Sequence, residues 1–199
     1  MRGEIVFGRL DPAAVRIDER ELRARLGEDA KSQALSSAVE SETLGIISAA
    51  VPAYAARRVP LQFLGGGKML VDSNLVESVG LERCLCGSEE AIILAVTLGA
   101  AVDRYIAKRR VLSESVGFVA DAVGSALAEA VCDSAEREIC RELSITKRFS
   151  PGYSDLSLSS QGWILDALSA SRLLGIALTD STLMVPVKSI TAIIGVKNG

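Results

Sequence analysis

Apolar residues recur at helical spacing over much of the chain. Between residues 30 and 50, Leu35, Val39 and Ile47 fall on one side of a helix, and Pro52 ends the pattern. The longest such stripe runs from 113 to 143 and contains several small residues that favour close packing. The periodicity predicts helices over residues 18–26, 30–50, 74–81, 101–110, 113–143 and 161–174.

Shorter apolar runs between turn residues predict strands. Gly65-Gly66-Gly67 separates two of them and lacks the Gly-Lys-Ser/Thr ending of a phosphate-binding loop, so a hairpin turn is the better interpretation. The strands are expected over residues 59–64, 68–71, 90–96, 176–178, 183–185 and 189–196. The order of elements indicates one α+β domain over residues 1–199, with a largely antiparallel sheet and a mostly helical part over residues 1–55.

The composition is typical of a globular protein. Of the 199 residues, 49% are apolar and 24% are charged, and the net charge is −3. The sequence has no dense basic stretch, so nucleic-acid binding is not expected. No uninterrupted apolar run approaches the roughly 20 residues of a membrane span, and the N-terminus lacks the apolar region of a signal peptide. These features favour a cytoplasmic protein that does not enter a membrane.

The chain contains no histidine. This excludes Ser-His-Asp and Cys-His catalysis and metal ligation through imidazole. The cysteines are expected to be reduced thiols, with a four-cysteine zinc site as the alternative. They are Cys84, Cys86, Cys132 and Cys140. Three carboxylates could serve a small-molecule enzyme, although their spacing shows no acid–base pair and surface positions are favoured. These are Asp155, Asp166 and Asp180.

The most distinctive segment is Arg148-Phe-Ser-Pro-Gly-Tyr153. Proline, glycine and several serines make residues 148–158 a loop by composition. An arginine can pair with a carboxylate as a planar fork, a loop glycine allows close backbone approach, and a tyrosine ring can face a cation. The structural alternative is a capping arginine, a proline turn and a core tyrosine.

This segment and the strands after it resemble the activation (reactivation) domain of cobalamin-dependent methionine synthase, which binds S-adenosylmethionine (AdoMet). The likeness continues through residues 176–181, 184–186 and 188–195, and more weakly through 91–103 and the long helix. It implies a mainly antiparallel curved sheet flanked by helices. It also implies an AdoMet site formed by Arg148, Ser150, Pro151, Gly152, Tyr153 and, on the long helix, Glu136.

The chain departs from that family's pattern at two places. Ser154-Asp-Leu-Ser157 stands where the larger domain has a Pro-Ala-Cys-Pro run. Ile193 and Ile194 stand where that domain has an aromatic pair in its last strand. In both respects the chain is similar to the short stand-alone members of the family.

The resemblance implies an accessory protein rather than a complete enzyme. The sequence lacks the Asp-x-His-x-x-Gly cobalamin motif, so cobalamin would be carried by a partner methyltransferase or corrinoid protein. AdoMet would supply the methyl group that restores methylcobalamin, and a flavodoxin-type reductant would supply the electron. One alternative is a docking module for a corrinoid protein that no longer binds AdoMet. Another is a different small-molecule enzyme on the same scaffold.

Overall fold

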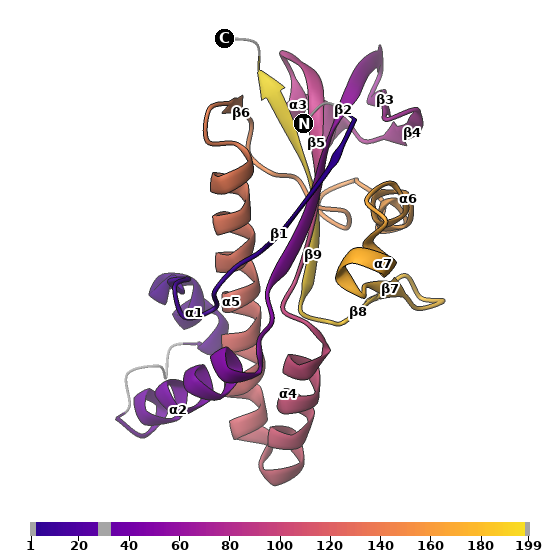
Figure 1. Ribbon diagram of the computed structural model, residues 1–199. Coiled ribbons are helices and arrows are strands. Elements are labelled where there is room, and N and C mark those ends of the chain that lie inside the picture. Colours follow the sequence, from indigo (N-terminus) through magenta and orange to yellow (C-terminus); the bar gives the residue numbers. More distant parts are fainter. Residues whose placement is uncertain (1–2, 28–32, 198–199) are drawn as a thin grey trace.

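A seven-stranded antiparallel sheet forms the centre of the molecule (Figure 1). In the computed structural model, which describes residues 3–27 and 33–197, six strands follow the order β4-β3-β2-β5-β9-β6, and β1 pairs with the first half of β2. The strands are β1 (Ile5–Arg9), β2 (Ala53–Gly65), β3 (Lys68–Val71), β4 (Asn74–Glu77), β5 (Ser88–Thr97), β6 (Ser144–Ile145) and β9 (Ser189–Lys197). A separate short hairpin consists of β7 (Ala177–Leu178) and β8 (Met184–Val185).

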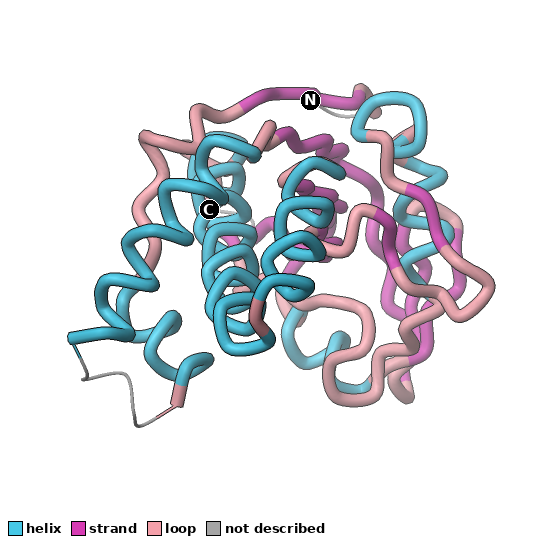
Figure 2. The backbone as a smooth tube through the Cα atoms, turned by 90° about the horizontal axis from the view of Figure 1, so that it is seen from below, coloured by secondary structure: helices cyan, strands magenta, loops and turns pink. Residues whose placement is uncertain are grey.

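Helices cover both faces of this sheet (Figures 1 and 2). One face carries α1 (Glu19–Leu26), α2 (Gln33–Ala49), α4 (Ala100–Leu112) and α5 (Glu114–Ile139). The other carries α3 (Val79–Leu85), α6 (Ser160–Ala167) and α7 (Ala170–Leu174). The predicted α+β class, an antiparallel sheet flanked by helices, is confirmed.

The central strand β5 shows why the sheet needs cover on both sides. From residue 91 to residue 97 every side chain is buried, as expected for a strand between two layers. Alternate side chains enter different cores. The core beneath α5 receives Ile92, Leu94 and Val96. The core beneath α6 receives Ala91, Ile93 and Ala95.

Helix α5 is long and apolar enough, by length and composition alone, to cross a membrane. However, 67% of its most apolar window is buried inside the fold. Ala120, Val123 and Leu127 of this helix are all fully buried in the core that α5 shares with the sheet. The hydropathy of α5 is therefore that of a core helix.

Two predictions about local structure near the N-terminal half are wrong. Residues 5–9, expected within a mostly helical part, form β1, because their backbone pairs with residues 53–57 of β2. Residues 74–81, expected as a helix, instead form β4 and the start of α3. Ser78 separates the two, since its hydroxyl oxygen accepts a hydrogen bond from the backbone N–H of Leu81 and caps α3.

Helix boundaries also differ from the periodic pattern. The helix expected over 161–174 is divided into α6 and α7, because Ser169 adopts a left-handed conformation with φ of 50°. The helix expected from residue 30 is described from Gln33 onward as α2, and its expected first residues lie outside the described residues. Apolar periodicity does not register the backbone conformation of a single residue such as Ser169.

Candidate functional site

The distinctive segment begins as an edge strand beside β9. β6 pairs with the end of β9, and Phe149 exchanges two backbone hydrogen bonds with Ile193, at 2.9 and 2.8 Å. Side chains of an extended segment alternate between faces. Phe149 enters the core beneath α6, whereas Arg148 reaches across to α5 on the opposite face. The segment therefore contacts both layers of the molecule.

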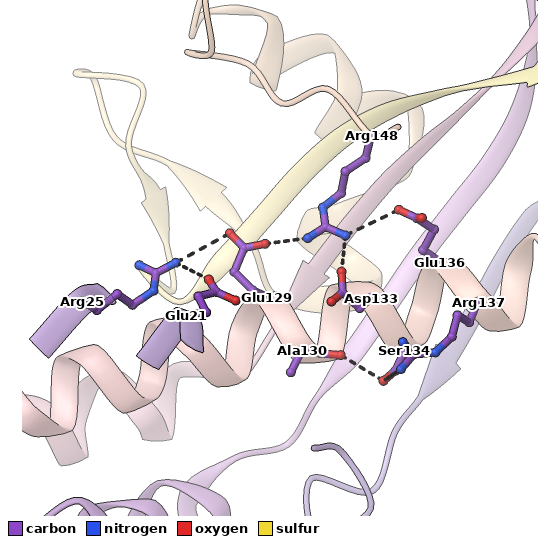
Figure 3. Close-up of polar contacts among 9 residues, drawn as sticks. All are labelled: Glu21, Arg25, Glu129, Ala130, Asp133, Ser134, Glu136, Arg137 and Arg148. Carbon is purple, nitrogen blue, oxygen red and sulfur yellow. Dashed lines mark hydrogen bonds and ion pairs between the residues drawn. The ribbon is translucent and has the colours of Figure 1, made fainter. Parts of the chain in front are cut away.

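Arg148 is surrounded by carboxylates from one side of α5 (Figure 3). Its guanidinium donates to Glu129 at 2.8 Å and to Asp133, and it forms an ion pair with Glu136 at 3.5 Å. The three acids are four and three residues apart, a spacing that brings side chains to one helix face. Glu129 also lies 4.0 Å from Arg25 of α1, so the network links α1, α5 and the edge segment.

The electrostatics of this cluster hold Arg148 in its charged form. Burial alone lowers the pKa of Arg148, but the Cys132 sulfur and the carboxylates of Asp133 and Glu129 outweigh it, so its pKa is raised. One guanidinium faces three carboxylates, and negative charge is in excess here. A buried oxygen of Glu136 makes no hydrogen bond within the described residues and has only the ion pair with Arg148.

Ser150, Pro151, Gly152 and Tyr153 form a tight turn beyond the edge strand. The backbone N–H of Tyr153 donates to the carbonyl of Ser150 at 3.1 Å, and that of Gly152 donates to Leu156 at 2.8 Å. Gly152 has φ of 87°, a conformation that L side chains rarely adopt. Tyr153 is 68% exposed, and its ring packs edge-on against Phe149 with centroids 5.3 Å apart. The turn thus presents an aromatic surface to solvent.

Asp155 connects this turn to α3. Its carboxylate accepts hydrogen bonds from the Ser78 hydroxyl at 2.5 Å, from the Val79 N–H at 2.7 Å and from the Gly80 N–H at 3.1 Å. The Ser78 bond, followed by the bonds from Val79 and Gly80, outweighs burial and holds the pKa of Asp155 below its ordinary value. The carboxylate is therefore ionised near neutral pH and occupied by structural donors.

A groove of about 680 Å³ lies around the C-terminal end of α5. Its charged lining includes Glu136, Arg137 and Arg141, and its apolar lining includes Leu143 and Ile145. This volume falls in the range of small-molecule sites, about 300–1,000 Å³. Among the predicted site residues, Glu136 is the one that lines it.

The structure therefore brings some of the predicted site residues together and separates others. Arg148 and Glu136 are ion-paired, and residues 150–153 share one turn. Ile193 and Ile194 are both fully buried and enter different cores, so the two side chains do not line a common pocket. The role of the predicted residues in ligand binding stays a prediction.

The remaining candidate groups are dispersed. Asp166 and Asp180 are exposed and lie in α6 and in the loop before β8. The four cysteines are free thiols, and burial is the main cause that raises the pKa of Cys132 to about 12 and of Cys140 to about 11. Within the described residues, no group of three or more possible metal ligands is found.

Sequence reasoning missed Glu129, Asp133 and the contact made by Asp155. The first two share a helix face with Glu136, so helical spacing contains a signal that could have identified them. The Asp155 contact joins residues 77 positions apart, and no local pattern indicates it.

Comparison with known proteins identifies the fold of the chain. No protein-family model and no curated protein match the sequence. Among solved structures, the chain is similar to the MetH reactivation domain bound to AdoHcy, with a TM-score of 0.71 and 14% sequence identity. The match covers 98% of this chain and 78% of that one. The chain therefore has the fold of the methionine synthase reactivation domain.

Proposed function

We propose that this protein binds AdoMet, or its product AdoHcy, at the segment from Arg148 to Tyr153. The observation that carries the proposal is the likeness over 98% of the chain to a reactivation domain whose structure contains AdoHcy. The Arg-x-x-Pro-Gly-Tyr segment supports it independently, because this resemblance rests on the residues and not on the fold.

The chemistry of the segment suits the parts of such a ligand. Gly152 leaves the backbone of the turn open to close approach. The exposed ring of Tyr153 can stack on adenine or face the sulfonium. The excess carboxylates of α5 around Arg148 favour a cationic group nearby. These residues would bind and orient the ligand and exclude water from it.

The proposed role is reactivation of a corrinoid held by a partner methyltransferase or corrinoid protein in the cytoplasm. AdoMet would supply the methyl group, and a reductant of the flavodoxin type would supply an electron to the partner's cob(II)alamin. The chain itself contributes no imidazole, since its sequence has no histidine. Its residues would position the sulfonium methyl rather than take part in bond making.

Titration calorimetry of the purified chain with AdoMet and AdoHcy tests the binding step. Saturable heat and a thermal shift are expected with both ligands. Tyr153→Ala should weaken binding of AdoMet, the ligand with a sulfonium, by about two- to fivefold, which matches roughly 0.5–1 kcal/mol for an exposed cation–π contact. Asp180→Ala, in the exposed loop between β7 and β8, is the control. Absence of heat and of a thermal shift at millimolar ligand would exclude the proposal.

The reactivation step needs a second assay. A partner methyltransferase in its cob(II)alamin state is mixed with AdoMet and a chemical reductant, and the visible spectrum of the cobalt is followed. Methylcobalamin should form faster when the chain is present than when it is absent. An unchanged rate with a chain that binds AdoMet would restrict the function to ligand binding.

One observation favours a second candidate, a docking module that does not bind AdoMet. The guanidinium of Arg148 is already matched by carboxylates of α5, so a ligand carboxylate would have to displace them. In that case a corrinoid protein would be captured by the immobilised chain to the same extent with and without AdoMet. Capture that depends on AdoMet would favour the first candidate.

A further inference from the structure

The turn that carries Tyr153 is attached to the rest of the molecule by few contacts. Its own hydrogen bonds are local, between residues 150 and 156. Beyond them, Leu156 is buried in the core beneath α6, and Asp155 provides the polar attachment. That attachment reaches the start of α3, which is distant in sequence.

Both Asp155 and the start of α3 contribute polar groups to this contact. Ser78 is 4% exposed and serves as the N-cap of α3: its hydroxyl oxygen accepts from the Leu81 N–H at 2.9 Å while its hydroxyl proton is donated to Asp155. The N–H groups of Val79 and Gly80 would otherwise lack partners, because the first amides of a helix have none within it. One carboxylate thus satisfies three donors.

The absence of a side chain at Gly80 makes this approach possible. A Cβ at that position would lie 2.9 Å from Asp155 Oδ1, 3.1 Å from Phe149 Cζ and 3.1 Å from Ser154 Oγ. Each of these atoms belongs to the Arg148–Asp155 segment. The space left at Gly80 therefore admits the Asp155 carboxylate, and the Gly80 N–H donates to it.

We propose that Asp155 is a positioning residue that clamps the turn carrying Tyr153 onto α3 in the conformation that binds the ligand. The part of this inference that concerns ligand binding rests on the proposed function. The clamp, meaning the contact between Asp155 and the start of α3, does not. Ordering a loop on binding weakens affinity. A turn held beforehand by three hydrogen bonds, two of them from backbone amides to a charged oxygen, avoids that cost.

Hydrogen exchange of the free protein tests the clamp without any ligand. In Asp155→Asn and in Gly80→Ala, the backbone amides at positions 79, 80 and 152 should exchange faster by about tenfold, the factor expected for loss of one charge-assisted hydrogen bond. Amides of β5 should be unchanged in both variants, which shows that the fold is intact. Unchanged exchange in the turn in both variants would overturn the clamp.

Calorimetry with AdoHcy then tests the positioning role. Asp155→Ala and Gly80→Ala should each lower the affinity by about tenfold, because the turn must be ordered on binding. Asp155→Asn, which keeps an acceptor oxygen, should recover part of the affinity that Asp155→Ala loses. Asp180→Asn provides the matched control and should bind as the wild type does.

The two kinds of failure are distinguishable. Faster exchange in the turn together with unchanged affinity would show that Asp155 holds the turn but does not position it for the ligand, and would overturn the proposal. If the wild-type chain binds neither AdoMet nor AdoHcy, the proposed function fails, and the positioning role fails with it. The exchange experiment would still decide whether the clamp exists.

Discussion

Arg148 illustrates how one residue can have both a structural and a functional interpretation. It joins the edge segment to α5 through Glu129, Asp133 and Glu136. The side chains of this cluster are between 22% and 48% exposed, so solvent screens them only in part. The structure thus gives the arginine a clear role in stability, whether or not a ligand also uses it.

Replacing Arg148 by alanine should destabilise the protein at neutral pH. The three carboxylates would then face one another with Arg25, 4.0 Å from Glu129, as the remaining neighbouring cation. A loss of about 1–2 kcal/mol is expected, between the values for exposed and buried ion pairs. Urea unfolding at pH 7 measures it.

Arg137→Ala is the matched control for this prediction. Arg137 lies on the same helix, is exposed and, within the described residues, donates to the Ser134 hydroxyl at 2.9 Å. A surface substitution of this kind usually changes stability by less than about 0.5 kcal/mol. Equal losses for the two variants at pH 7 would contradict an ionic role for Arg148.

At the residue scale, sequence reasoning selects some residues that lie together but does not find all of their contacts. Arg148 and Glu136 were predicted to share a site, and they are ion-paired. The same reasoning interpreted Asp155 as a surface carboxylate, which agrees with its exposure but omits its three donors. Those donors come from an element 75 or more positions away, and no spacing rule connects them.

At the scale of elements, α2 packs closely against α4 around Glu42 and Gly45. The buried carboxylate of Glu42 on α2 accepts from the Tyr105 hydroxyl at 2.9 Å and from Arg109. Gly45, one turn further along α2, leaves room for the tyrosine ring: a Cβ there would lie 2.0 Å from the hydroxyl oxygen of Tyr105. The two helices could not approach this closely with a larger residue.

Gly45→Ala should therefore destabilise the protein although alanine favours a helix. Overpacking typically costs about 1–3 kcal/mol, which exceeds the gain in helix propensity of up to about 1 kcal/mol. Gly162→Ala in α6 is the matched control, since its nearest neighbour would be 4.0 Å away. Thermal unfolding should show a lower midpoint for the first variant and an equal or higher one for the second. The reverse order would contradict the packing argument.

Element prediction succeeded where one periodicity dominated a long segment. α5 and β5 were predicted within a few residues, because a continuous stripe or run of apolar residues marks each of them. The sequence does not predict β1, which has five residues, or β4, which has four. Both are short and are held by pairing with another strand. Sequence patterns this short do not distinguish a strand from a helix.

At the scale of the whole molecule, the sheet divides the interior into two cores. In the larger one, beneath α5, burial raises the pKa of a tyrosine and of a cysteine. Burial, followed by the hydrogen bond and charge of Glu138, raises the pKa of Tyr54 from 10.0 to about 12. Burial is also the first cause that raises the pKa of Cys132 from 9.0 to about 12. Both groups belong to the core beneath α5.

Stability should therefore be lost at alkaline pH. A group whose pKa is raised on folding contributes stability that is complete below its unfolded pKa and disappears as pH rises to the folded value. For Tyr54 and Cys132 the window extends from about 9 to about 12. The free energy of unfolding, measured in urea, should be constant from pH 7 to about 8.5 and fall steeply above 9.

Tyr54→Phe provides the test of this assignment. The variant keeps the ring and removes one of the groups that titrate, so its free energy of unfolding should fall less steeply with pH between about 10 and 12 than that of the wild type. A wild-type stability that stays constant to pH 11 would contradict the prediction.

The hydrogen bonds of the edge segment have a consequence for how copies of this protein behave toward one another. An open strand edge is a template for self-association. β9 would present such an edge, but β6 pairs with it at its end and Phe149 pairs with it further along. Between them, the Thr146 N–H donates to Gly195, and the Thr146 hydroxyl accepts from the Gly195 N–H at 2.9 Å. Loosening the segment that carries the candidate site would therefore expose an unpaired strand edge and favour self-association of the protein.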